Sequence, residues 1–149
     1  MEKMLEIGVH LVLDGYTQDT SCIGDLNRVR DFLDTFPVHM GMTKVMEPYV
    51  FRYQGGSPQE DGISGIVIIA ESHISIHTFP ARGYVSVDIF SCKPFDVTEA
   101  VRKLIEYFYL VDYCHQVFDR GIEYPKEMPS VIPLVLEERL QNLEKMVHT

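Results

Sequence analysis

The stretch SGIVIIAESHISIHTFPARGYVSVDIFSC, residues 64–92, contains three runs that favour β-strands. The first run, 64–70, is almost continuously apolar, which is typical of a strand in the interior of a sheet. The runs 73–79 and 84–92 alternate between polar and apolar residues, and the four residues between them end in a glycine. This pattern predicts a β-hairpin next to the interior strand.

The hairpin sets the register between its two strands. If Phe79 pairs with Tyr84, Cys92 falls opposite Glu71, so a thiol lies beside the Glu71-Ser72 bond. One face of the hairpin then carries apolar residues, and the other carries His73, Ser75, His77, Tyr84, Ser86 and Asp88. A purely structural sheet does not need so many donors and acceptors on one face, so we interpret this face as functional.

The rest of the chain predicts a mainly antiparallel sheet with helices on one face, an α+β fold. The other predicted elements are strands over 4–13, 43–53 and 111–119, and helices over 26–36 and 97–109 that Asp25 and Asp96 cap. We expect the first helix to end at Pro37 and the second strand to be interrupted at Pro48, near a sheet edge. Residues 1–125 are predicted to form one domain, followed by a C-terminal tail, 126–149, that becomes helical over 135–147.

Composition limits the classes of function. With 149 residues, 46% of them hydrophobic, the chain is large enough for one domain with a core. A net charge of −9 disfavours nucleic acid as a partner and suits a cationic ligand or simple solubility. The three cysteines form no CxxC pair, which predicts neither a disulfide framework nor a zinc site. We see no signal-peptide pattern and no apolar run long enough for a membrane span, so we expect a cytoplasmic protein without membrane contact.

The long motif with Glu71-Ser72, His77 and Cys92 resembles the self-processing segment of bacterial and archaeal S-adenosylmethionine decarboxylases. The similarity extends more weakly from about Leu5 to Pro125. The resemblance implies a two-layer α/β sandwich, cleavage of the chain between Glu71 and Ser72, and decarboxylation of S-adenosylmethionine for polyamine synthesis. The substrate would be a small molecule of the cationic amino-acid type.

The resemblance also implies a role for each residue of the motif. Ser72 would attack the carbonyl of Glu71 and become a pyruvoyl group, which forms a Schiff base with the substrate amine. Ser64 would aid processing as a donor, His77 would act as the processing base, and Cys92 would protonate the product at carbon. The implied cofactor is therefore the pyruvoyl group itself, with no metal and no pyridoxal phosphate.

The distance between Ser72 and His77 suggests an assembly. Five residues of extended chain separate them by about 16 Å, which is too far for direct proton transfer. Either the chain folds back after Ser72, or His77 serves the Ser72 of a second copy. Members of the family that this chain resembles are homodimers with active sites at the interface, and we favour the second interpretation.

Two positions depart from the family pattern and leave the substrate open. Where the family typically has a glutamate that binds the ribose hydroxyls, this chain has Ala81, and Pro58 replaces an aromatic residue that stacks on adenine. Phe51 and Tyr53 are candidate substrate contacts, and Glu60 is a further possibility. Some relatives decarboxylate L-arginine or L-ornithine instead, and we keep both as alternative substrates.

Other functions fit the motif less well. An unprocessed, non-catalytic partner that regulates an active paralogue would have no chemical need for the complete set of Ser64, Ser72, His77 and Cys92. The HxxxH spacing of His73 and His77 imitates a zinc motif, but that geometry needs a helix and this segment favours a strand. A hydrolase dyad of Cys92 and His77 would have only Asp88 nearby to orient it.

Overall fold

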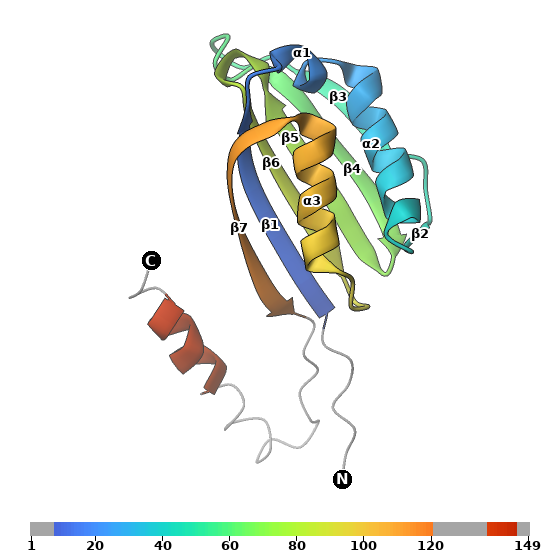
Figure 1. Ribbon diagram of the computed structural model, residues 1–149, viewed down its shortest axis with the longest axis vertical. Coiled ribbons are helices and arrows are strands. Elements are labelled where there is room, and N and C mark those ends of the chain that lie inside the picture. Colours follow the sequence, from blue (N-terminus) through green and yellow to red (C-terminus); the bar gives the residue numbers. More distant parts are fainter. Residues whose placement is uncertain (1–7, 121–136, 146–149) are drawn as a thin grey trace. The chain divides into compact units, whose positions relative to one another are not determined.

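Within residues 8–120, seven strands form one antiparallel sheet, and helices α2 (Leu26–His39) and α3 (Val97–Phe108) cover one of its faces (Figure 1). The structure is a computed structural model that describes residues 8–120 and 137–145. The two layers confirm the predicted α+β fold with helices on one face of an antiparallel sheet. The predicted domain boundary at residue 125 lies outside the described residues.

The strand order places the central motif in the middle of the sheet. The order is β2 (Thr43–Lys44), β4 (Gly62–Ala70), β5 (Ser72–Phe79), β6 (Tyr84–Ser91), β1 (Gly8–Thr17) and β7 (Leu110–Arg120), and β3 (Tyr49–Tyr53) also pairs with β4. The predicted interruption at Pro48 separates β2 from β3. Both short strands lie on the edge side of β4, where a proline without an N–H removes few ladder hydrogen bonds.

The hairpin between β5 and β6 has the predicted register. Phe79 pairs with Tyr84 and His77 pairs with Ser86 across the short helix η1 (Pro80–Arg82). Gly83 closes the turn with a φ of 64°, and a Cβ there would lie 2.6 Å from the Thr17 carbonyl oxygen. Only glycine satisfies both conditions without strain, so this residue holds the hairpin turn against the end of β1.

Both predicted helix caps are present. The Asp25 side chain accepts hydrogen bonds from the backbone of Asn27 and Arg28, and the Asp96 side chain accepts one from the backbone of Glu99 at 3.0 Å. The prediction that the first helix ends at Pro37 is wrong, because α2 continues to His39. Pro37 cannot donate the backbone hydrogen bond to the preceding turn, and burial of its ring in the core offsets this loss.

The core lies between the two helices and the covered face of the sheet. Its largest fully buried side chains include Phe32, Leu33, Ile74, Ile76, Leu104 and Phe108. Each such side chain stabilises the fold by about 1.5–3 kcal/mol relative to an exposed one. The alternation of β5 and β6 therefore buries the predicted apolar set and leaves the polar set on the other face.

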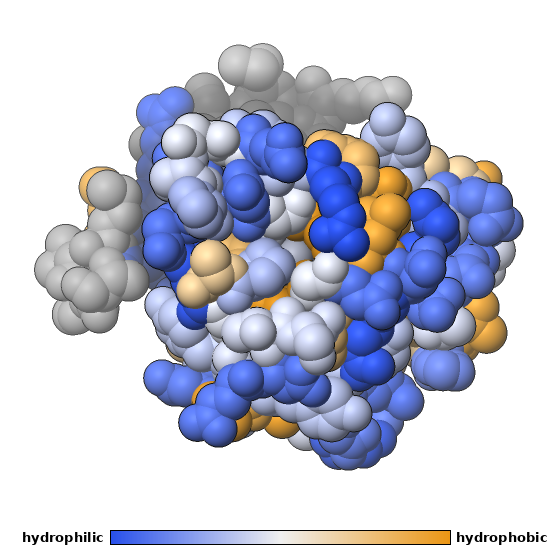
Figure 2. Space-filling model, turned by 90° about the horizontal axis from the view of Figure 1, so that it is seen from above, coloured by the Kyte–Doolittle hydropathy of each residue, from blue (hydrophilic) through white to orange (hydrophobic). Residues whose placement is uncertain are grey.

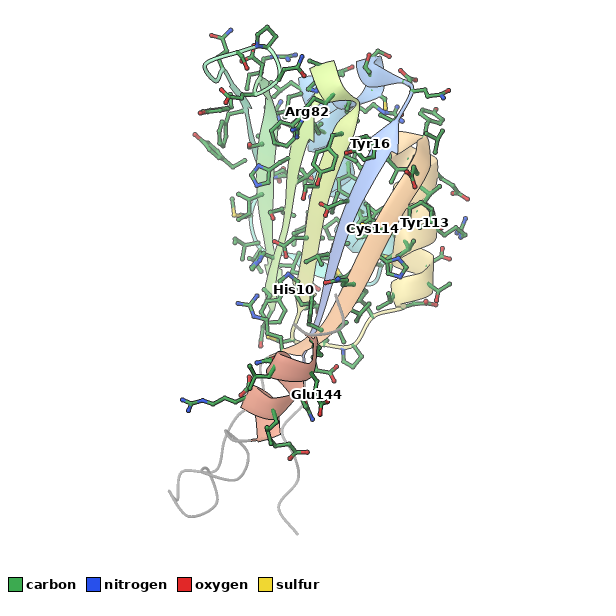
Figure 3. The ribbon with its side chains drawn as sticks, turned by 90° about the vertical axis from the view of Figure 1, so that its left-hand side faces the viewer. His10, Tyr16, Arg82, Tyr113, Cys114 and Glu144 are labelled. Atoms are coloured by element: carbon green, nitrogen blue, oxygen red, sulfur yellow. The ribbon has the colours of Figure 1, made fainter. Side chains whose placement is uncertain are left out.

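We call that other face, which neither α2 nor α3 covers, the open face. Figure 3 views the sheet from the side, with Arg82 near one end of the strands and His10 towards the other. Residues 137–145 form a helix, as predicted, while the rest of the predicted tail helix lies outside the described residues. None of the helices within 8–120 and 137–145 has the length and hydropathy that a membrane span requires.

Candidate active site

The connection between β4 and β5 holds the Glu71-Ser72 bond. Ser72 has a φ of 125°, in a region that residues other than glycine rarely adopt. A backbone held there costs on the order of 1–3 kcal/mol and persists only where the surrounding structure enforces it. Here the tight turn after Ala70 and the pairing of Ser72 with Ser91 on β6 enforce it.

Cys92 lies directly beside this bond, as the register predicts. Its backbone N–H donates a hydrogen bond to the Glu71 carbonyl oxygen at 3.0 Å, and its sulfur is 3.5 Å from the Ser72 hydroxyl oxygen. The Cys92 residue is partly buried. The carbonyl that Ser72 would attack is thus already polarised by an N–H donor.

Ser64 and His77 form a second pair on the open face. They lie opposite each other on β4 and β5, and the Ser64 hydroxyl oxygen is 2.9 Å from His77 Nδ1. Ser72 pairs with Ile69, five positions along the same two strands. The structure therefore brings Ser64 to His77 and Cys92 to Ser72, while the strand spacing separates the two pairs by about 16 Å.

A network around Asp88 occupies the open face nearer to Ser72. The Asp88 carboxylate accepts hydrogen bonds from Ser75, at 2.8 Å, and from His10 Nε2, while His73 Nε2 lies 3.7 Å away. The Arg120 guanidinium lies 3.4 Å from Nδ1, the other ring nitrogen of His10. His10 and Arg120 were missing from the sequence-based site because their partners depend on the order of β6, β1 and β7. The alternation of residues along β1, with Val9, Leu11 and Leu13 on one side of the strand and His10 on the other, was the signal that the sequence offered for His10.

Tyr84 and Asp14 occupy the open face closer to the hairpin turn. Ser86 donates a hydrogen bond to Asp14 at 2.8 Å, and the ring of Tyr84 lies 5.2 Å from that of Tyr16. Burial of the Tyr84 phenol, aided by its hydrogen bond to Asp14, raises its pKa to about 12. The Tyr84 hydroxyl therefore stays protonated at neutral pH and can donate a hydrogen bond on the open face.

A cleft of about 510 Å³ lies at the end of the sheet remote from Ser72. Its walls include Arg52, Tyr53, Asp61, Pro80 and Ala81. Seen from this end, the protein surface is largely hydrophilic (Figure 2). Asp61 accepts a hydrogen bond from the Gly55 backbone at 2.8 Å, which fixes its carboxylate in the cleft wall.

The candidate substrate residues separate in the structure. Tyr53 lines the cleft with Pro58, whereas Phe51 pairs with Ser64 on the open face and is 43% exposed. Glu60 is occupied by a hydrogen bond from the Gly56 backbone at 2.6 Å. Asp61 was not selected from the sequence, because a carboxylate within a loop rich in glycine gives no signal of where it points.

The other cysteines lie away from Ser72. Cys22 is buried and its thiol donates to the Asp19 carbonyl at 3.0 Å, and burial raises the pKa of this thiol. Cys114 is exposed on β7, opposite Asp14 of β1. Among residues 8–120 and 137–145, no cluster of three or more His, Cys, Asp or Glu side chains is arranged to hold a metal ion.

Comparisons with known proteins identify relatives over most of the chain. Residues 9–121 match the family model for S-adenosylmethionine decarboxylase. The S-adenosylmethionine decarboxylase proenzyme of Pyrococcus horikoshii is 37% identical over 137 residues, which cover 90% of this chain and 93% of that protein. The proenzyme of Moorella thermoacetica is 31% identical over 132 residues, or 86% and 98% of the two chains. The crystal structure of the adenosylmethionine decarboxylase from Aquifex aeolicus matches with a TM-score of 0.65 and 29% identity, over 85% of this chain and 98% of that one.

Proposed function

This chain belongs to the S-adenosylmethionine decarboxylase family, and we propose that it cleaves itself between Glu71 and Ser72 and then decarboxylates S-adenosylmethionine. The observation that carries this proposal is the backbone of Ser72, whose φ of 125° stores strain at the bond to be broken. The relatives' description as proenzymes supports the same conclusion.

Cleavage starts with an acyl shift. The Ser72 hydroxyl attacks the Glu71 carbonyl carbon, the peptide nitrogen leaves, and an ester joins the two residues. The Cys92 N–H, 3.0 Å from the carbonyl oxygen, stabilises the negative charge that develops there. The shift also releases the unfavourable backbone conformation at Ser72, which offsets part of the cost of replacing an amide by a less stable ester.

A base then removes the proton from the α-carbon of Ser72, and the ester carboxylate leaves as the new C-terminus of the first fragment, at Glu71. The remaining dehydroalanine loses its nitrogen as ammonia on reaction with water, which leaves a pyruvoyl group at position 72. We assign the base to His77, which Ser64 orients through its hydroxyl at 2.9 Å. A pyruvoyl group supplies a carbonyl that accepts the electrons released when the substrate carboxylate leaves.

His77 must come from a second copy of the chain, because about 16 Å of strand separates it from the Ser72 of its own chain. The open face supports a homodimer with active sites at the interface. It exposes large apolar side chains beside its polar network, among them Tyr16 at 49%, Phe51 at 43% and Ile68 at 38%. Packing two open faces together would remove these side chains from water.

Cys92 is the proposed proton donor to carbon after carbon dioxide leaves. Its sulfur is 3.5 Å from the Ser72 hydroxyl oxygen, so it lies next to the carbons on which the reaction takes place. It reaches them from its own chain, whereas the base for processing comes from the partner. The residues thus divide between the two steps, with Ser64 and His77 serving cleavage and Cys92 serving turnover.

The substrate is S-adenosylmethionine on the strength of the relatives' names, with L-ornithine or L-arginine as the second candidate. The second candidate is favoured by Ala81, which offers no acceptor for a ribose diol. The cleft is remote from the Ser72 of its own chain, so in this proposal it serves, like His77, the Ser72 of the second copy. There Asp61 supplies the carboxylate that position 81 lacks, and Tyr53 supplies an aromatic surface. Either substrate places the enzyme in cytoplasmic polyamine synthesis.

Release of carbon dioxide from carboxyl-labelled substrates tests the proposal. Purified protein should release labelled carbon dioxide from S-adenosylmethionine, and the Ser72→Ala variant should release none. If the protein releases labelled carbon dioxide only from ornithine or arginine, that amino acid is the substrate and the proposed mechanism stands. Cleaved protein that releases none from any of the three would contradict the proposed decarboxylation, and uncut protein that releases none would favour the unprocessed, non-catalytic partner.

A further inference from the structure

A groove of about 320 Å³ runs between helices α2 and α3, on the helical layer of the protein. Phe32, Phe36 and Tyr107 provide aromatic walls, and the rings of Phe32 and Tyr107 are 5.3 Å apart. Phe32 and Phe36 are only 1% and 3% exposed, so they form the floor. The volume is at the lower end of the range for small-molecule sites, roughly 300–1,000 Å³.

Two cationic side chains, Arg28 and Lys103, lie beside this aromatic floor. Arg28, His39 and Lys103 line the groove, with Glu106 as its acidic residue. Arg102 already pairs with Glu106 at 2.6 Å, so that carboxylate is neutralised locally. Lys103 in turn lies 3.5 Å from Glu99, so Arg28 is the cation in the groove lining that the ion pairs of the described residues leave uncompensated, and it favours an anion in the groove.

Arg28 is the residue whose bonding is incomplete. Its guanidinium donates to the Tyr107 carbonyl and lies 4.6 Å from the centre of the Tyr107 ring. None of the ion pairs found within residues 8–120 and 137–145 includes Arg28. Within the same described residues, its Nε is the buried side-chain nitrogen that lacks a hydrogen-bond partner. A partly desolvated cation that makes no ion pair within the described residues gains more from an added anion than an exposed cation does.

We propose that this groove binds a small amphipathic anion, with a flat apolar body on the aromatic floor and a carboxylate or phosphate against Arg28 and Lys103. The binding site is separate from the Ser72 centre, because it lies on the face of the sheet opposite the open face. It does not depend on the proposed decarboxylase activity.

Titration of the full-length protein with phenylphosphate tests the proposal, using calorimetry together with amide chemical shifts. We expect a Kd at or below about 1 mM and shifts at Phe36 and Tyr107. Inorganic phosphate and benzyl alcohol, which each carry half of the ligand chemistry, should bind more weakly. Arg28→Gln should weaken phenylphosphate binding about ten- to a hundredfold, and Arg30→Gln, an exposed arginine on the same helix, should leave it unchanged.

Lys103→Gln provides a second variant if Arg28→Gln does not fold, since Arg28 also bonds to the end of α3. It should weaken binding by a smaller factor. Saturation by phenylphosphate with no shifts in the groove, or equal affinity of the Arg28→Gln and Arg30→Gln variants, would overturn the proposal. Equal affinity for inorganic phosphate would contradict the role of the aromatic floor.

Discussion

At the scale of single residues, Ser72 and Cys92 illustrate how much one hairpin register determines. The turn sequence predicts that Phe79 pairs with Tyr84, which places Cys92 opposite Glu71. The structure contains the corresponding hydrogen bond, from the Cys92 backbone N–H to the Glu71 carbonyl oxygen. The roles of these residues in the reaction stay predictions, and each can be tested by one substitution.

Substitution of Cys92 by alanine should slow turnover by a factor of about 10²–10⁴, the usual effect of losing a general acid. Without this acid, the carbanion left by loss of carbon dioxide is more often protonated at the carbon of the pyruvoyl group than at the substrate carbon. More of the pyruvoyl group should therefore end as alanine at position 72. Product analysis and intact mass report the two effects. The matched control is Cys114→Ala, which removes an exposed thiol on β7 and should leave both readings unchanged. A Cys92→Ala enzyme with wild-type turnover would assign the acid to another residue.

Substitution of Ala81 by glutamate should raise kcat/KM for S-adenosylmethionine and leave it unchanged for arginine and ornithine. A charge-assisted hydrogen bond to the ribose diol is worth about 1.5–3 kcal/mol, or roughly ten- to a hundredfold. Steady-state kinetics with the three substrates measure the change.

The control for this prediction is Gln54→Glu, which adds a carboxylate elsewhere in the same cleft. An equal gain from both substitutions would mean that the added negative charge, and not a ribose contact, is responsible. If the wild-type enzyme is already efficient on S-adenosylmethionine and Ala81→Glu has no effect, Asp61 or Tyr53 carries the contact instead.

At the scale of elements, helix α3 depends on its N-terminal cap. Asp96→Ala removes the acceptor for the Glu99 N–H at 3.0 Å and should lower the free energy of unfolding by about 1 kcal/mol. Urea unfolding in the uncleaved Ser72→Ala background measures it on a single chain. Asp96→Asn keeps the acceptor and should lie within about 0.5 kcal/mol of the parent, so an equal loss in both variants would refute the cap as the cause.

The elements also show what a sequence can and cannot predict. Local signals sufficed for the caps at Asp25 and Asp96 and for the turn at Gly83, because each depends on residues within a few positions. The end of α2 could not be predicted from the sequence, because burial of Pro37 against the core outweighs the tendency of proline to end a helix. The partners of His10 did not follow either, since they depend on which strands become neighbours far along the chain.

At the scale of the whole molecule, the spacing of about 16 Å between Ser72 and His77 leads to a prediction about assembly. Ser72→Ala and His77→Ala chains should each remain uncut alone. Co-expressed with two different tags, they should form heterodimers in which the His77→Ala chain is cleaved, because its Ser72 meets the partner's intact histidine. Electrophoresis of the purified heterodimer reads this directly, and heterodimers that never process would place the reaction within one chain.

The most direct test of the account is the intact mass of the purified protein, since every later step requires the break between Glu71 and Ser72. We predict two fragments, residues 1–71 and 72–149, with the second fragment beginning in a pyruvoyl group in place of serine. Ser72→Ala should give one uncut chain of 149 residues. An active wild-type protein that is uncut and retains its serine would contradict the central claim.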